Sequence, residues 1–190
     1  MLDAFAPCDI DRVEDRLDDN DARDLIADPH TVTVIACGAL AREILAVKAA
    51  NRLDHLRLAC VTATLHNHPD RIPEAVRSAI HAARASGASE VVVAFGDCGT
   101  GGRLDRVLAE EGVARIAGPH CYAMFMAGFD WPEPAEDEDM TAFFLTDFLV
   151  RQFETLVIRP LGLDRHPELR DMYFGHYRSV VYLAQTDDPA

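Results

Sequence analysis

Short β-rich runs alternate with helical patterns through the middle of the chain, and this alternation limits the possible folds more than any other feature. Runs of valine, isoleucine and other apolar residues predict strands over residues 31–36, 56–63, 90–95 and 113–117. Apolar residues at helical spacing predict helices over about 39–53, 73–87 and 103–111. This order requires crossovers between parallel strands. We therefore expect an α/β fold, a parallel sheet of about four or more strands with helices on both faces.

The flanking segments predict how the chain is organised. Residues 1–30 hold 10 acids and 3 arginines, which is typical of a solvated arm and would also suit an arm that binds a partner. Residues 31–190 are then expected to form a single α/β domain. Its parts are a sheet core, an acidic and proline-rich linker, and a mainly helical C-terminal segment, over residues 31–128, 129–140 and 141–190 respectively.

The charge balance excludes several classes of partner. The 190 residues contain 18 Lys and Arg against 32 Asp and Glu, a formal net charge of −14. Nucleic acids and anionic membranes bind clustered positive charge, so we expect neither as a partner. No apolar stretch is long enough to span a bilayer, and the N-terminus does not resemble a secretory signal. With an odd number of cysteines, five, the sequence predicts a cytoplasmic protein without a disulfide framework.

Cysteines follow three of the four predicted strands. Cys37, Cys98 and Cys121 come after the first, third and fourth strands, and ligands of open α/β sheets bind beyond the carboxyl ends of the strands. Cys60 lies inside the second strand and Cys8 in the arm, so we expect both to stand apart. A thiolate is the form of cysteine that binds metals. The spacing matches no zinc-finger or ferredoxin pattern, so a metal site here depends wholly on the predicted fold.

Two histidines and one aspartate are expected at the same edge of the sheet. His66 follows the second strand and His120 precedes Cys121, which makes both candidate acids, bases or metal ligands. Asp97 precedes Cys98 and is a candidate base or a partner of that thiol.

A glycine-rich loop follows Cys98. Its backbone N–H groups could bind an anionic part of a substrate, or the loop could simply be a tight turn, and the residues concerned are Gly99, Thr100, Gly101 and Gly102. No lysine ends the loop, which argues against a nucleoside triphosphatase. In the C-terminal segment, Arg151 and Arg165 could orient an anionic substrate group, or pair with nearby acids at the surface.

Three thiolates with one open coordination position suit two kinds of cofactor. A zinc ion would be held by the cysteines and a histidine, whereas a [4Fe–4S] cluster would use the cysteines alone. The sequence does not separate the two, although the available histidines favour zinc slightly.

Several long strings resemble one protein family. They include IACGALAREI, LHNHPDRIPEAV, VVAFGDCGTGG, RIAGPHCY and FFLTDFLVRQFETLVIRPLGLDRHPELRDMYFGHY. Over about residues 31–185 the chain resembles the prokaryotic domain-of-unknown-function family numbered 1638. That resemblance implies a setting in corrinoid-dependent methyl transfer and one-carbon metabolism. The chain has His68 and Ala123 where the family pattern has Arg and Glu, which argues against essential chemistry at those two positions.

Three functions fit these observations. The first is a metal-dependent enzyme that acts on a small molecule, with a corrinoid protein as a possible partner implied by the resemblance. The second is a non-catalytic accessory or carrier module with a structural metal or none. The third is a metal-free enzyme in which Cys98 is the nucleophile and loop amides stabilise the oxyanion.

Overall fold

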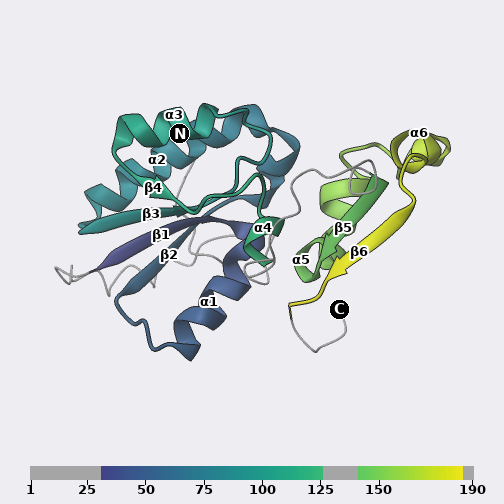
Figure 1. Ribbon diagram of the computed structural model, residues 1–190. Coiled ribbons are helices and arrows are strands. Elements are labelled where there is room, and N and C mark those ends of the chain that lie inside the picture. Colours follow the sequence, from purple (N-terminus) through teal and green to yellow (C-terminus); the bar gives the residue numbers. More distant parts are fainter. Residues whose placement is uncertain (1–30, 126–140, 186–190) are drawn as a thin grey trace. The chain divides into compact units, whose positions relative to one another are not determined.

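The computed structural model describes residues 31–125 and 141–185, which belong to two compact units (Figure 1). The first unit ends at Cys121 and the second begins at Tyr122. The sequence predicted one domain with a linker over residues 129–140. That linker and the acidic arm over residues 1–30 lie outside the described residues, as does Cys8.

A four-stranded parallel sheet forms the first unit, in the order β2-β1-β3-β4. The strands are β1 (Val32–Cys37), β2 (Leu56–Val61), β3 (Glu90–Ala94) and β4 (Ala114–Arg115). β1 is central and pairs with β2 and β3, with Ile35 opposite Ala59 on one side and Val93 on the other. The predicted α/β fold is therefore confirmed, although β4 is much shorter than the predicted run.

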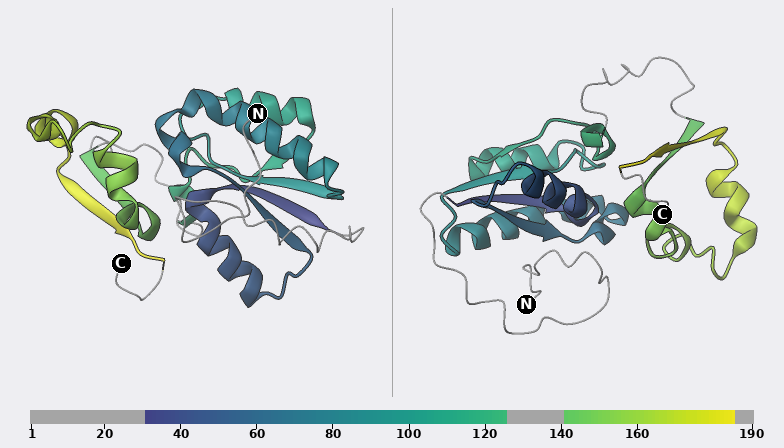
Figure 2. Two further views of the ribbon diagram at one scale, coloured as in Figure 1. Left: turned by 180° about the vertical axis from the view of Figure 1, so that it is seen from behind. Right: turned by 90° about the horizontal axis from the view of Figure 1, so that it is seen from below.

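Helices lie on both faces of this sheet. They are α1 (Ala41–Ala50), α2 (Ile72–Ala85) and α3 (Arg103–Glu111), with short 3₁₀ turns η2 (Gly38–Leu40), η3 (Ala63–Asn67) and η4 (Pro69–Arg71). α2 and α3 cover one face and α1 lies on the other (Figures 1 and 2). Val76 and Ile80 of α2, one helical turn apart, are fully buried together with Leu104 of α3. The hydrophobic core therefore lies between the sheet and the α2–α3 layer.

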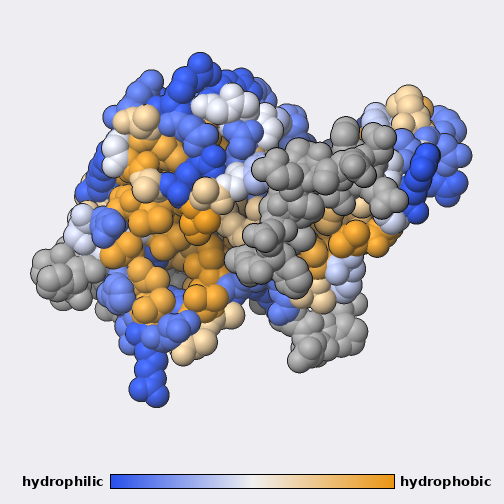
Figure 3. Space-filling view, viewed as in Figure 1, coloured by the Kyte–Doolittle hydropathy of each residue, from blue (hydrophilic) through white to orange (hydrophobic). Residues whose placement is uncertain are grey.

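The face on the α1 side is only partly covered within the described residues. Val34, Leu58 and Val92 project from neighbouring strands on this face and are half-buried. Ile116, after β4, is 49% exposed, and Val47, in α1, is 57% exposed. Hydrophobic residues accordingly gather on the surface of the first unit below the α2–α3 layer (Figure 3).

The strand order places a crevice between β1 and β3. From β1 the chain crosses to β2 on one side, whereas β3 lies on the other side of β1. The connections that leave β1 and β3 therefore run in opposite directions, and a crevice opens at the carboxyl ends of these two strands. In open α/β sheets this position is where ligands bind.

The second unit contains a two-stranded parallel sheet and short helices. Its elements are α4 (Tyr122–Phe125), β5 (Ala142–Thr146), α5 (Asp147–Arg151), the π-helical turn η6 (Glu154–Ile158), η7 (Pro167–Leu169), α6 (Arg170–Phe174) and β6 (Ser179–Leu183). The sequence pattern predicted a helix from Thr141, but Ala142–Thr146 pairs with β6 as a strand. The pairing partner lies more than 30 residues away, so local periodicity could not reveal it. Among the described residues, no helix is long and apolar enough to cross a membrane.

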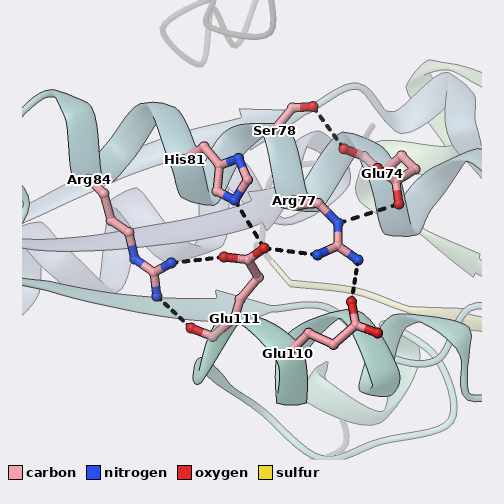
Figure 4. Close-up of polar contacts among 7 residues, drawn as sticks. All are labelled: Glu74, Arg77, Ser78, His81, Arg84, Glu110 and Glu111. Carbon is pink, nitrogen blue, oxygen red and sulfur yellow. Dashed lines mark hydrogen bonds and ion pairs between the residues drawn. The ribbon is translucent and has the colours of Figure 1, made fainter.

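A network of ion pairs joins α2 to α3 (Figure 4). The carboxylate of Glu111 accepts hydrogen bonds from Arg77 at 2.9 Å, from Arg84 at 2.8 Å and from His81 at 2.9 Å. Arg77 also pairs with Glu110 at 2.6 Å. Burial acts to raise the pKa of Glu111, but the hydrogen bonds from His81 and Arg77 outweigh it and lower that pKa overall. The charged form of Glu111 therefore stabilises the helix pair.

We predict that Glu111→Gln lowers the free energy of unfolding at pH 7. The variant should also lose less of that free energy than wild type as the pH falls. A carboxylate whose pKa is lowered by folding stabilises the protein above its unfolded pKa of about 4.3, and this contribution disappears as the pH falls through the folded pKa. Urea unfolding between pH 7 and pH 3 measures the effect. Glu90→Gln, which alters an exposed carboxylate at the start of β3, is the control and should follow the wild type. Equal pH profiles for wild type and Glu111→Gln would contradict the prediction.

Candidate functional site

Backbone hydrogen bonds join the loop after β3 to the loop after β4. The N–H of Asp97 donates to the carbonyl of Gly118 and the N–H of Cys98 to that of Pro119, both at 2.9 Å. The sequence placed Cys121 directly after the fourth strand, but β4 ends at Arg115. Cys121 is therefore brought to the site by this pairing of loops rather than by the strand itself.

Gly96 allows the two loops to meet. A Cβ atom at this position would lie 2.4 Å from Cα of His120 and 2.5 Å from its carbonyl carbon. Only a residue without a side chain permits such an approach between two backbones.

Cys98 and Cys121 are in contact. Their Sγ atoms are 3.9 Å apart, and Cys98 has a φ of 49°, a left-handed conformation that is uncommon outside glycine. The hydrogen bond with the Cys121 thiol, helped by the backbone N–H groups of Cys121 and Gly96, lowers the pKa of Cys98 to about 7. The same bond raises the pKa of Cys121. Cys98 is therefore the thiol of this pair that ionises first.

Cys37 completes a group of three thiols. It ends β1 and is only 8% exposed, and burial raises its pKa to about 12. The thiol interacts electrostatically with both Cys98 and Cys121. The three cysteines that the sequence selected therefore interact with one another, and all three are free thiols.

The 3.9 Å separation can be compared with the geometry of metal sites. Two thiolates on one tetrahedral zinc ion lie roughly 3.5–4 Å apart, whereas the cysteines of a [4Fe–4S] cluster lie about 6 Å apart. The Cys98–Cys121 pair agrees with the mononuclear distance. Across residues 31–125 and 141–185, however, no group of three or more His, Cys, Asp or Glu side chains is placed so that it could hold a metal ion. One pair of thiols therefore has the spacing of a mononuclear centre, whereas the described residues do not form a set of three ligands.

The side chain of Asp97 organises the glycine-rich loop. Its carboxylate accepts hydrogen bonds from the Thr100 hydroxyl at 2.7 Å and from the N–H groups of Gly101 and Gly102 at 3.0 and 2.8 Å. The bond from Thr100 is the largest of the effects that lower the pKa of Asp97. Both carboxylate oxygens are thus used to shape the turn that leads into α3, and the two glycine N–H groups point at Asp97. The roles predicted for Asp97 as a base and for this loop in binding an anion stay predictions.

The two candidate histidines lie in the segments that follow β2 and β4. His66 lies in η3, after β2, and the loop that follows η3 reaches the glycine-rich loop, where Pro69 Cβ is 3.5 Å from the position of a Cβ at Gly99. His120 is half-buried beside Cys121. Partial burial lowers the pKa of both rings, which favours the neutral imidazole that can bind a metal or accept a proton.

Sequence reasoning missed Arg115. Its guanidinium makes a two-point ion pair with Asp105 of α3, at 2.5 and 3.1 Å, and donates to the carbonyls of Phe95 and Gly118. It also interacts electrostatically with Asp97 and Cys98. Arg115 therefore fastens the β4 loop to the end of β3 and supplies positive charge beside the thiols. No motif marks it, because its partners come from three separate segments.

Sequence reasoning also missed a buried carboxylate in the second unit. Asp147 is 1% exposed at the carboxyl end of β5, and its oxygens accept from the Tyr182 hydroxyl at 2.6 Å and the Gln185 N–H at 3.2 Å. Arg151 and Arg165 belong to this unit too. Both are exposed, and Arg165 lies 3.8 Å from Asp164. Their expected role in orienting a substrate stays a prediction.

Cys60 differs from the other described cysteines. It lies in β2, opposite Ala36, and takes part in a disulfide. The sequence predicted no disulfide framework, so the disulfide at Cys60 was not expected. That Cys60 stands apart from the three thiols stays a prediction.

Comparison with known proteins assigns the chain to a family. A family model described as "Protein of unknown function (DUF1638)" matches residues 60–190. The chain belongs to this family. The match contains Cys98 and Cys121 and begins after Cys37. No curated protein and no solved structure matches the chain.

We predict that Gly96→Ala separates Cys98 from Cys121. The added Cβ would overlap the backbone of His120, and overpacking of this kind costs about 1–3 kcal/mol of stability. Oxidation by diamide, followed by mass spectrometry of the Cys98–Cys121 crosslink, should show slower crosslinking in the variant than in wild type. Gly38→Ala is the control, because its Cβ would lie at an ordinary 3.6 Å from its neighbours. Crosslinking of Gly96→Ala at the wild-type rate would rule the explanation out.

Proposed function

We propose that this protein is a metal-dependent enzyme acting on a small molecule, and that Cys37, Cys98 and Cys121 hold the metal in the crevice between β1 and β3. The observation that carries the proposal is the 3.9 Å separation of Cys98 Sγ and Cys121 Sγ, with Cys37 close enough to interact with both. That separation favours a mononuclear zinc ion over a [4Fe–4S] cluster. The three cysteines would fill three of the four positions of such a zinc ion. In a catalytic site the fourth position stays open for substrate, and in a closed site His66 or His120 is the candidate fourth ligand.

The residues around the thiols have separate tasks in this proposal. Asp97 holds the glycine-rich loop in shape, and Arg115 holds the β4 loop against β3, so that Cys98 and Cys121 stay together. The histidine that is not a ligand would accept or donate a proton. A metal at this position would supply Lewis acidity, which polarises a carbonyl group or activates a nucleophile.

The reaction class follows from the family resemblance alone. We propose a small methylated compound as substrate and a corrinoid protein as partner, in one-carbon metabolism. The three free thiols fit a reducing compartment such as the cytoplasm, whereas the disulfide at Cys60 does not. Turnover of methylated substrates with and without a corrinoid protein separates an enzyme from a carrier: a bound metal without turnover would favour the accessory module.

We predict that Cys98→Ser removes the metal and that Cys60→Ser retains it. Cys98 contributes a thiolate to the proposed centre, whereas Cys60 lies in β2 outside it. Elemental analysis and an anaerobic absorption spectrum of protein purified without chelators measure the metal content and identify zinc or iron. We expect one centre per chain in wild type and in Cys60→Ser.

Two results would contradict this expectation. Equal metal content in Cys98→Ser and Cys60→Ser would place the metal elsewhere. Wild-type protein without metal, even after reconstitution with zinc or with iron and sulfide, would favour the metal-free enzyme instead. In that case Cys98, which is more exposed than the buried Cys37, should be the thiol that iodoacetamide alkylates first.

A further inference from the structure

The second unit contains an apolar pocket of about 580 Å³ between its strands and the segment that joins them. Small-molecule sites have volumes of about 300–1,000 Å³, so the pocket can hold a ligand of that size. Its apolar wall includes Phe143, Phe153, Leu163, Phe174, Tyr177 and Val180. All of its lining residues belong to the second unit, whereas the thiols belong to the first.

Aromatic contacts fix the shape of the wall. The ring of Phe143 in β5 meets Phe174 edge to face, with ring centres 5.5 Å apart, and meets Tyr177 in the same way at 5.1 Å. The rings of Phe143 and Phe153 also meet edge to face, with centres 6.2 Å apart. Because each ring is held by its neighbour, the pocket keeps an apolar interior that suits a hydrocarbon or an aromatic ring.

Two arginines line the same pocket, and they differ in their partners. The guanidinium of Arg170 donates a hydrogen bond to the carboxylate of Asp171 at 3.1 Å. The side chain of Arg178 makes no hydrogen bond or ion pair with the described residues, and only its backbone N–H is bonded, to Thr141. Arg178 is exposed just before β6. The apolar pocket therefore carries one guanidinium that is available for a ligand.

We propose that this pocket binds a monocarboxylic acid with an aromatic or aliphatic tail. The tail occupies the space lined by Phe143, Phe174 and Tyr177, and the carboxylate pairs with Arg178. A guanidinium can donate two parallel hydrogen bonds to a carboxylate, which a neutral ligand of the same shape cannot use fully. The net charge of −14 opposes the binding of an anion, and the Arg178 guanidinium is the group that would offset this repulsion in the pocket.

Calorimetric titration of the whole protein with 4-phenylbutyrate and with the neutral 4-phenylbutan-1-ol tests the proposal. We expect the acid to bind more tightly than the alcohol and to lose affinity as salt is added, because an exposed ion pair is screened. Arg178→Gln should weaken binding of the acid by about 5-fold or more and leave the alcohol nearly unchanged. Arg159→Gln is the matched control, since Arg159 is an exposed arginine of the same unit that pairs with Glu154 and does not line the pocket.

A second variant locates the carboxylate without disturbing the aromatic wall. Val180 is 64% exposed and lines the pocket, so Val180→Glu should fold and should repel the acid more than the alcohol. Failure of both compounds to bind, or equal weakening by Arg159→Gln and Arg178→Gln, would overturn the proposal. A dimer that Val180→Glu dissociates, with no binding of either compound, would assign the pocket to a second copy of the chain and overturn it as well.

Discussion

The candidate site depends on the contact between the loop after β3 and the loop after β4. Two backbone hydrogen bonds, from Asp97 to Gly118 and from Cys98 to Pro119, join these loops, and Gly96 lets the backbone of His120 approach. β4 pairs with β3 over two residues only, so the sheet contributes little to holding the second loop. This contact therefore holds Cys121 beside Cys98.

The polar side chains around that contact hold the loops in position. Asp97 accepts three hydrogen bonds within its own turn, and Arg115 connects Asp105 with carbonyls on both loops. Opposite charges therefore surround the thiols although the chain as a whole is strongly acidic. The pKa values of Cys37 and Cys98 are nevertheless shifted in opposite directions mainly by other effects: burial raises that of Cys37, and the hydrogen bond with the Cys121 thiol lowers that of Cys98.

Much of the first unit could be predicted from the sequence. The run Val91–Val93 and the apolar spacing of Val76 and Ile80 are local signals. They predicted a strand and a helix, and β3 and α2 lie at these positions. The second unit was less predictable. β5 reads as part of a helical pattern, and only pairing with β6 makes it a strand. Asp147 likewise gave no signal of burial, because the Tyr182 hydroxyl and the Gln185 N–H that satisfy it lie 35 and 38 residues away.

The sequence by itself determined the class of fold and put thiols after three strands of a parallel sheet, because strand propensity, helical periodicity and the position of a cysteine are all read within a few residues. Only the tertiary structure decided the order β2-β1-β3-β4, which opens the crevice between β1 and β3. It also decided that Cys98 and Cys121 touch, that Gly101 and Gly102 donate to Asp97, and that Cys60 is paired in a disulfide. The strand order and the contact between Cys98 and Cys121 join segments that are separated in the chain. The bonds within the glycine-rich loop are local. The acceptor of each N–H group nevertheless depends on the conformation that the packed loop adopts.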